Sequence, residues 1–91
     1  MARVMLHGAY RELAGGLREI SVGGGSVRSV LAHVVRTCPQ LAERLRDEHG
    51  RLREHLRLFV NGNDVEDLQG EDTLIGEADT VQLSPALSGG T

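Results

Sequence analysis

Residues 17–38 read LREISVGGGSVRSVLAHVVRTC, and the hydrophobic period changes inside this stretch. Up to Val22 hydrophobic and polar residues alternate, which is typical of a strand with one buried face. Three glycines end the alternation, and Ser26 is a good N-cap for a helix. The next hydrophobic residues follow helical spacing and form one stripe, consisting of Val27, Val30, Leu31, Val34, Val35 and Cys38. The stretch therefore predicts a strand followed by an amphipathic helix.

A first strand is predicted before this stretch, over 3–7. Its inward positions are Val4 and Leu6, and its outward positions are Arg3, Met5 and His7. The glycine pair at 15–16 then turns the chain back, and Ile20 and Val22 share a face of the second strand. The chain is therefore predicted to open with a β-hairpin.

The segment after the helix is predicted to form a second, peripheral helix. Pro39 cannot continue the first helix, because its ring clashes with the preceding turn. Residues 40–49 have Leu41 and Leu45 at helical spacing among charged residues, and Gly50 is expected to stop the helix.

The period returns to two over 56–60, whose inward positions are Leu56, Leu58 and Val60. Residues 61–64 read NGND, a strong tight-turn signal, so a second hairpin is predicted here.

The remainder of the chain is predicted to close the fold with one more strand. Residues 66–79 are acidic and rich in turns, and their expected hydrophobic anchors are Leu68, Leu74 and Ile75. A strand over 80–84 turns Val81 and Leu83 inward. Pro85 is expected to end its pairing, because proline has no N–H to donate.

The order of these elements predicts an α+β fold of the β-grasp type. We expect a mixed sheet of four to five strands over one main helix, with the first and last strands parallel at its centre. A chain of 91 residues supports one small domain, and with 2% aromatic residues its core must be aliphatic. The domain is expected to span 1–85, with a flexible C-terminal tail over 86–91.

Charge and composition exclude several classes of partner. The net charge is −3, residues 1–57 carry all ten Arg, and residues 58–91 carry seven acids and no base. Arg residues interleaved with acids and almost no aromatics argue against nucleic-acid binding. The hydrophobic runs are far shorter than the roughly 20 residues of a membrane-spanning helix. A single Cys and no signal-peptide pattern favour the cytoplasm.

No catalytic or metal-binding pattern is present either. The four His residues and Cys38 have neither zinc-site nor metalloprotease spacing, so no metal is expected. Cys38 continues the hydrophobic stripe, which predicts a small buried residue rather than a nucleophile. We expect no self-contained enzyme and no bound cofactor.

Phe59 predicts a surface for docking a partner. It lies on the strand face that the helix does not cover, and it is the only Phe of the chain. Its expected neighbours on that face are Gln82 and Ser84 of the last strand and Met5 and His7 of the first. An exposed aromatic side chain on such a face is typical of a contact surface.

The end of the chain reads LSPALSGGT over 83–91. Two successive glycines carry no side chains, so Gly89 and Gly90 could thread through a narrow channel into the active site of another protein. Leu87 and Ser88 complete this threading tail.

Taken together with the predicted fold, several segments resemble the ubiquitin-like sulfur-carrier family, the ThiS/MoaD group. Residues 4–15 (VMLHGAYRELAG) look like the opening strand and loop of that family. Residues 59–62 (FVNG), 72–79 (DTLIGEAD) and 85–90 (PALSGG) continue the resemblance in order. It covers nearly the whole chain.

The resemblance implies a chemistry for the tail. In that family an ATP-dependent enzyme similar to ubiquitin-activating enzymes adenylates the C-terminal glycine, which is then converted to a thiocarboxylate. Gly90 would carry the sulfur here, and a separate biosynthetic enzyme would accept it, to make cysteine, a thiamin thiazole or another sulfur metabolite. ATP would be used by the activating enzyme and not held by the carrier.

Thr91 departs from the pattern, because family members end on the glycine. The Gly90–Thr91 peptide would have to be hydrolysed before loading. Some family members carry such extensions and are trimmed by a metalloprotease, so the resemblance implies a proform.

Three other functions remain open from the sequence. The chain could be the small subunit of molybdopterin synthase. It could be a ubiquitin-like modifier that forms isopeptide bonds through Gly90, or a β-grasp adaptor that binds partners through the Phe59 face.

Overall fold

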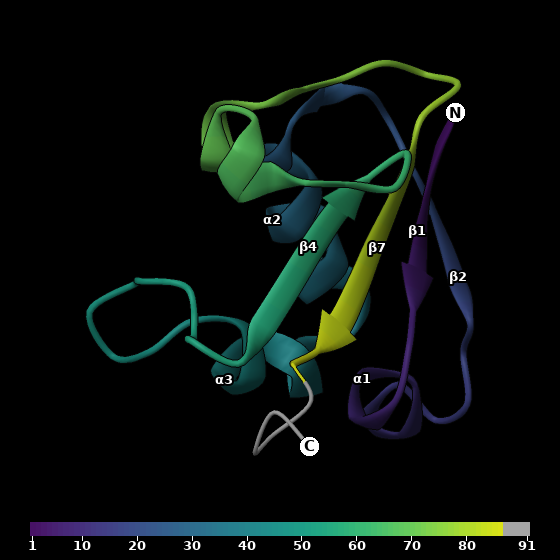
Figure 1. Cartoon of the computed structure of the whole chain (residues 1–91). Coiled ribbons are helices and arrows are strands. Elements are labelled where there is room, and N and C mark those ends of the chain that lie inside the picture. Colours follow the sequence, from purple (N-terminus) through teal and green to yellow (C-terminus); the bar gives the residue numbers. More distant parts are fainter. Residues whose placement is uncertain (87–91) are drawn as a thin grey trace.

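The computed structural model describes residues 1–86 and contains a five-stranded sheet (Figure 1). Its strand order is β2-β1-β7-β4-β5. The strands are β1 (Ala2–Leu6), β2 (Glu19–Val22), β4 (Leu56–Val60), β5 (Asn63–Asp64) and β7 (Thr80–Pro85). The central β1 and β7 are parallel, and the other pairs are antiparallel. The β-grasp prediction is confirmed.

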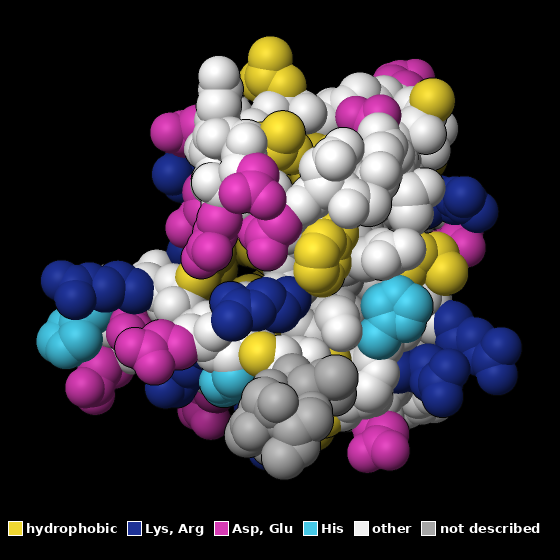
Figure 2. Space-filling model, in the orientation of Figure 1, with side chains coloured by type: hydrophobic (Ala, Val, Ile, Leu, Met, Phe, Trp, Pro, Cys, Tyr) yellow, Lys and Arg dark blue, Asp and Glu magenta, His cyan; other side chains and the backbone are white. Residues whose placement is uncertain are grey.

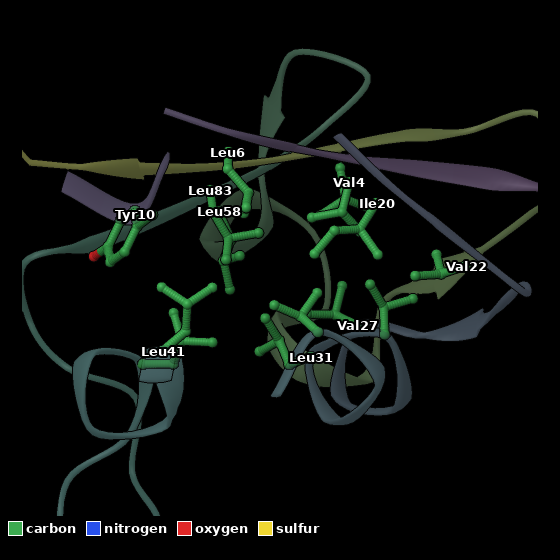
Figure 3. Close-up of a cluster of buried hydrophobic side chains, with 14 of the residues drawn as sticks. Val4, Leu6, Tyr10, Ile20, Val22, Val27, Leu31, Leu41, Leu58 and Leu83 are labelled. Atoms are coloured by element: carbon green, nitrogen blue, oxygen red, sulfur yellow. The ribbon is translucent and has the colours of Figure 1, made fainter. Parts of the chain in front are cut away.

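The main helix, α2 (Val27–Thr37), covers one face of this sheet (Figure 1). Ser26 caps it as predicted, in a capping box in which Ser26 and Ser29 each accept from the other's backbone N–H. The helix buries the stripe Val27, Val30, Leu31 and Val34. The side chains of α2 meet the inward faces of the strands, which include Val4, Ile20 and Val22 (Figure 3).

The connection between β1 and β2 contains a short helix, α1 (Ala9–Leu13), where the sequence predicted only a glycine turn. Gly8, at the N-cap, has φ 57°, and Gly15 and Gly16 also have positive φ, a conformation that glycine adopts without strain. Tyr10 of this helix is 2% exposed, so α1 belongs to the core.

The hydroxyl of Tyr10 is buried without a hydrogen-bond partner. Burial raises the pKa of the phenol, and nearby Arg44 opposes that shift. Because a buried unpaired hydroxyl costs free energy, Tyr10→Phe is expected to raise the free energy of unfolding by about 1 kcal/mol. Urea unfolding of both proteins measures this, and a destabilised Tyr10→Phe variant would show that the hydroxyl has a partner in solution.

The second helical segment is shorter than predicted. Pro39 begins a 3₁₀ turn, η1 (Pro39–Leu41), because its missing N–H costs nothing in a first turn. The helix α3 (Ala42–Leu45) then ends four residues before His49, the predicted limit. Leu41 and Leu45 are buried as predicted.

A loop over 46–52 follows α3. It is closed by a bridge between Arg46 and Leu52. Inside it, Asp47 Oδ1 accepts from the backbone N–H groups of His49 (2.8 Å) and Arg51 (3.0 Å). The hydrogen bond from the Arg51 backbone N–H is the largest of the effects that lower the pKa of Asp47. These bonds give the loop a defined shape.

The acidic stretch forms η2 (Val65–Asp67), η3 (Gly70–Asp72) and β6 (Leu74–Ile75). Two of its predicted anchors are wrong, since Leu68 is 44% and Leu74 78% exposed. The third predicted anchor, Ile75, is buried as expected, and Val65, which was not predicted as an anchor, is buried too. Half-buried Glu71 also fixes the stretch, through a two-point ion pair with Arg46. Arg46 follows the end of α3 and lies 25 residues before Glu71, so no local pattern indicates this pair.

The glycines before α2 have a structural role, because they let the backbone pass close to β6. Gly25 and Ser26 form β3, which pairs with β6 in a separate two-stranded sheet. A Cβ on Gly24 would lie 2.7 Å from the Ile75 carbonyl oxygen, so only glycine fits there. Among residues 1–86, no helix is long and hydrophobic enough to cross a membrane.

Candidate functional site

The last strand, β7, positions the root of the tail at one end of the sheet. β7 lies between β1 and β4, and its pairing with β4 continues through Pro85, which pairs with Leu56. The prediction that Pro85 ends the pairing is therefore wrong by one residue. The Ala86 N–H donates to the His55 carbonyl oxygen at 2.6 Å. The backbone is thus held by β1 as far as Leu83 and by the β4 side as far as Ala86, the first residue of the expected tail.

Gly8 and Pro85 pack together at this end of the sheet. A Cβ on Gly8 would lie 3.0 Å from Pro85 Cγ and 3.2 Å from its Cδ. The His7 N–H donates to the Leu83 carbonyl oxygen at 3.0 Å. The α1 loop and the start of β4 therefore enclose the root of the tail. The tail residues of the sequence prediction, Leu87, Ser88, Gly89, Gly90 and Thr91, lie outside the described residues.

The five residues predicted to form a docking face lie on the side of the sheet opposite α2. Phe59 pairs with Gln82, and Gln82 pairs with Met5, so these three side chains form a row across β4, β7 and β1. All three are half-buried. Ser84 and the exposed His7 lie one row nearer the tail.

Two residues near the root of the tail, Arg57 and His55, were not predicted to belong to the site. Arg57 pairs with Ser84 and shares the face of Phe59. His55, two positions earlier, lies exposed beside Ala86. The alternation of β4 already placed Arg57 on this face, but its closeness to the tail follows only from the pairing with β7.

Acidic side chains gather beside this face, over η2 and η3 (Figure 2). Some are engaged within the fold: Glu71 pairs with Arg46, and Asp72 pairs with Arg28 at 2.7 Å. Within the described part of the chain, no ion pair is formed by Glu66, Asp67 or Glu77. A negative potential therefore remains on the outer surface of this segment.

Asp79 fixes the turn that leads into β7. Its carboxylate accepts from Asn61 Nδ2 (2.9 Å) and from the Gly76 N–H (2.7 Å). These two bonds favour the charged form and lower the pKa of Asp79. Asn61 itself has φ 51° and Gly62 has φ 87°, as in the tight hairpin turn that the sequence predicted.

No cluster of three or more His, Cys, Asp or Glu side chains that could hold a metal ion occurs in the described residues. Cys38 is 4% exposed at the end of α2, in the position predicted for a small core residue.

Comparisons with known proteins agree with this architecture. A model of the ThiS family matches residues 4–90. The sulfur carrier protein CysO of Mycobacterium tuberculosis is 30% identical over 82 residues, 88% of each chain. The solution structure of small archaeal modifier protein 1 (SAMP1) from Methanosarcina acetivorans has a TM-score of 0.89 at 27% identity, covering 98% of this chain and 95% of that one.

The CysO of Amycolatopsis orientalis, crystallised in a complex with BexX, has the same fold. Its TM-score is 0.86 at 24% identity, covering 99% of this chain and all of that one (100%).

Proposed function

This chain belongs to the ThiS family, and we propose from that premise that it is a sulfur carrier whose terminal glycine is loaded by a separate enzyme. The observation that supports this most strongly is the position of the Gly89-Gly90 pair, which follows the central strand β7 after only three residues. The likeness to CysO, a sulfur carrier protein, supports the same function.

The proposed loading has two steps. The Gly90 carboxylate attacks the α-phosphate of ATP, forms the acyl-adenylate and releases pyrophosphate. A sulfur nucleophile then attacks the acyl carbon, breaks the bond to AMP and leaves a thiocarboxylate. Both steps take place in the active site of the activating enzyme, so this chain contributes the acyl group and the means of delivering it.

The fold contributes a rigid base for that delivery. The pairing of Pro85 with Leu56 and the bond from Ala86 to His55 fix where the chain leaves the sheet. Residues 86–91 act as the arm that enters the enzyme. The Phe59 face adjoins the exit point, so an enzyme bound to this face lies beside the arm.

We assign three kinds of partner to this chain. The activating enzyme docks first, on the row formed by Phe59, Gln82 and Met5 and on the neighbouring Ser84 and His7. A biosynthetic enzyme then accepts the sulfur. Docking of the activating enzyme is the first step after a metalloprotease has removed Thr91.

Intact-mass measurement tests the proposal. The chain ending at Gly90, incubated with its activating enzyme, ATP and a sulfur donor, is expected to gain about 16 Da as sulfur replaces oxygen. A chain shortened further, to Gly89, serves as the matched control and should react poorly, because its carboxylate stops short of the catalytic centre. No mass gain for the Gly90 chain would refute the carrier function.

A second candidate function is a protein modifier, and the likeness to SAMP1, a modifier protein, favours it. The chain has no Lys, so it could not modify its own side chains at lysine. A ladder of larger conjugates in the same mass experiment would support this function. Copurification with a large catalytic subunit would instead support a molybdopterin synthase subunit.

A further inference from the structure

A cleft of about 270 Å³ lies beside the exposed sheet face, along the outer edge of β4. Its hydrophobic lining consists of Leu52, Leu56, Leu58 and Val65. Figure 2 shows a hollow on this face, with hydrophobic atoms at its floor, acidic side chains on one side and a basic side chain on the other. The cleft is smaller than most small-molecule sites, which hold roughly 300–1,000 Å³.

The edge of β4 at this cleft has no neighbouring strand among residues 1–86. β5 pairs only with Phe59 and Val60, so the Leu56–Leu58 part of β4 extends beyond it (Figure 1). The His55 carbonyl and the Asn61 N–H both bond to β7. Because backbone directions alternate along a strand, the N–H and C=O groups of Leu56 and Leu58 point to the cleft side. The Leu56 N–H already donates to the Arg53 carbonyl oxygen at 3.1 Å, so the edge offered to a partner consists of the Leu56 C=O and the Leu58 N–H and C=O.

The rim of the cleft carries opposite charges on its two sides. Arg53, Glu54 and Arg57 lie on the β4 side, which has a net positive charge, while Asp64 and the exposed Glu66 lie on the η2 side. Within the described chain Arg57 forms no ion pair across the cleft. Beneath the rim, the pair between Glu71 and Arg46 fixes η3 against the end of α3. The cleft is therefore held open between fixed walls.

The cleft also lies close to the root of the tail. Leu56, part of its lining, pairs with Pro85, and neighbouring strands are about 4.8 Å apart. Arg57 belongs both to the cleft and to the face that bears Phe59. An enzyme that receives the tail and covers Phe59 must therefore pass next to the cleft.

From these observations we propose that the cleft binds an extended segment of the activating enzyme, which adds to the edge of β4. An aliphatic side chain of that segment enters the hydrophobic lining. A Lys or Arg next to it pairs with Glu66, and Arg57 meets a carboxylate or carbonyl on the other side. Strand addition at an exposed edge is a common mode of peptide recognition. The inference rests on the proposed carrier function and specifies how its first partner is recognised.

The test measures the kinetics of loading for charge-reversed variants of the chain ending at Gly90. Glu66→Arg is expected to raise KM for the carrier about fivefold or more, with kcat unchanged, because a rim charge acts on encounter and affinity. Glu77→Arg is the matched control, since Glu77 is exposed in the same acidic stretch but does not line the cleft. It should change KM less than about twofold.

A second pair of variants tests the hydrophobic part of the cleft. Leu52→Gln should raise KM, whereas Leu68→Gln, at an exposed position away from the cleft, should not. Thermal melting of each variant verifies that it is folded. If Leu52→Gln fails to fold, Glu66→Arg alone decides the outcome.

The outcomes separate this inference from the carrier function. If the unaltered chain gains sulfur but Glu66→Arg and Glu77→Arg have the same KM, the cleft is not the site and the carrier function stands. An effect of Glu66→Arg only on transfer to the acceptor enzyme also overturns the inference. If the unaltered chain gains no sulfur, the carrier function itself fails.

Discussion

The chain ending at Thr91 is expected to give no acyl-adenylate, whereas the chain ending at Gly90 is expected to be adenylated. The reason is chemical: in a chain that ends at Thr91 the Gly90 carbonyl is part of a peptide bond, and the free carboxylate is that of Thr91. Thr91 also has a β-branched side chain, which a channel fitted to glycine excludes. ATP–pyrophosphate exchange with the activating enzyme measures the difference.

The control is a chain in which Thr91 is replaced by Gly. If the block is the extra residue itself, Thr91→Gly is as inactive as the chain ending at Thr91. If the block is the bulk of the threonine side chain, Thr91→Gly regains part of the exchange. Equal exchange by the chains ending at Thr91 and at Gly90 would contradict the proform hypothesis.

Phe59→Ala is expected to raise KM for loading more than about tenfold, because aromatic residues at the centre of an interface often contribute 2 kcal/mol or more to binding. The kcat should change little, since Phe59 does not touch the reacting carboxylate. Phe59 is half-buried and lies outside the core cluster, so the variant is expected to fold.

Leu74→Ala is the matched control for Phe59→Ala. Leu74 is a large hydrophobic side chain, 78% exposed, but it belongs to the separate sheet formed by β3 and β6. It should leave KM unchanged. An equal effect of the two substitutions would mean that the Phe59 face is not the docking surface.

The core residues and the succession of strands and helix along the chain could be predicted from the sequence because each depends on local periodicity. Ile20 and Val22 alternate on β2, the stripe from Val27 to Val34 follows a helical period, and all are buried as predicted. A residue's burial within a regular element depends mainly on which face it occupies, and periodicity reports that face directly.

Irregular segments were predicted less well. The helix α1 is only five residues long, too short to show a clear period. Leu68 and Leu74 were expected to be anchors because they are hydrophobic, yet Leu68 at the end of η2 and Leu74 in the two-residue strand β6 are both exposed. In a turn-rich segment neither period applies, so hydrophobicity alone does not indicate which side chain is buried.

The sequence by itself determined the family resemblance, the inward-facing side chains of the strands and of the main helix, and the chemistry of the diglycine end. Each of these is encoded in residues near one another in the chain. Only the tertiary structure decided that Leu56 pairs with Pro85 and that Arg46 joins Glu71. It also created the cleft beside β4 from residues 52–58 and 64–71. Contacts between segments far apart in the chain depend on how complete elements pack, and no local pattern records that packing.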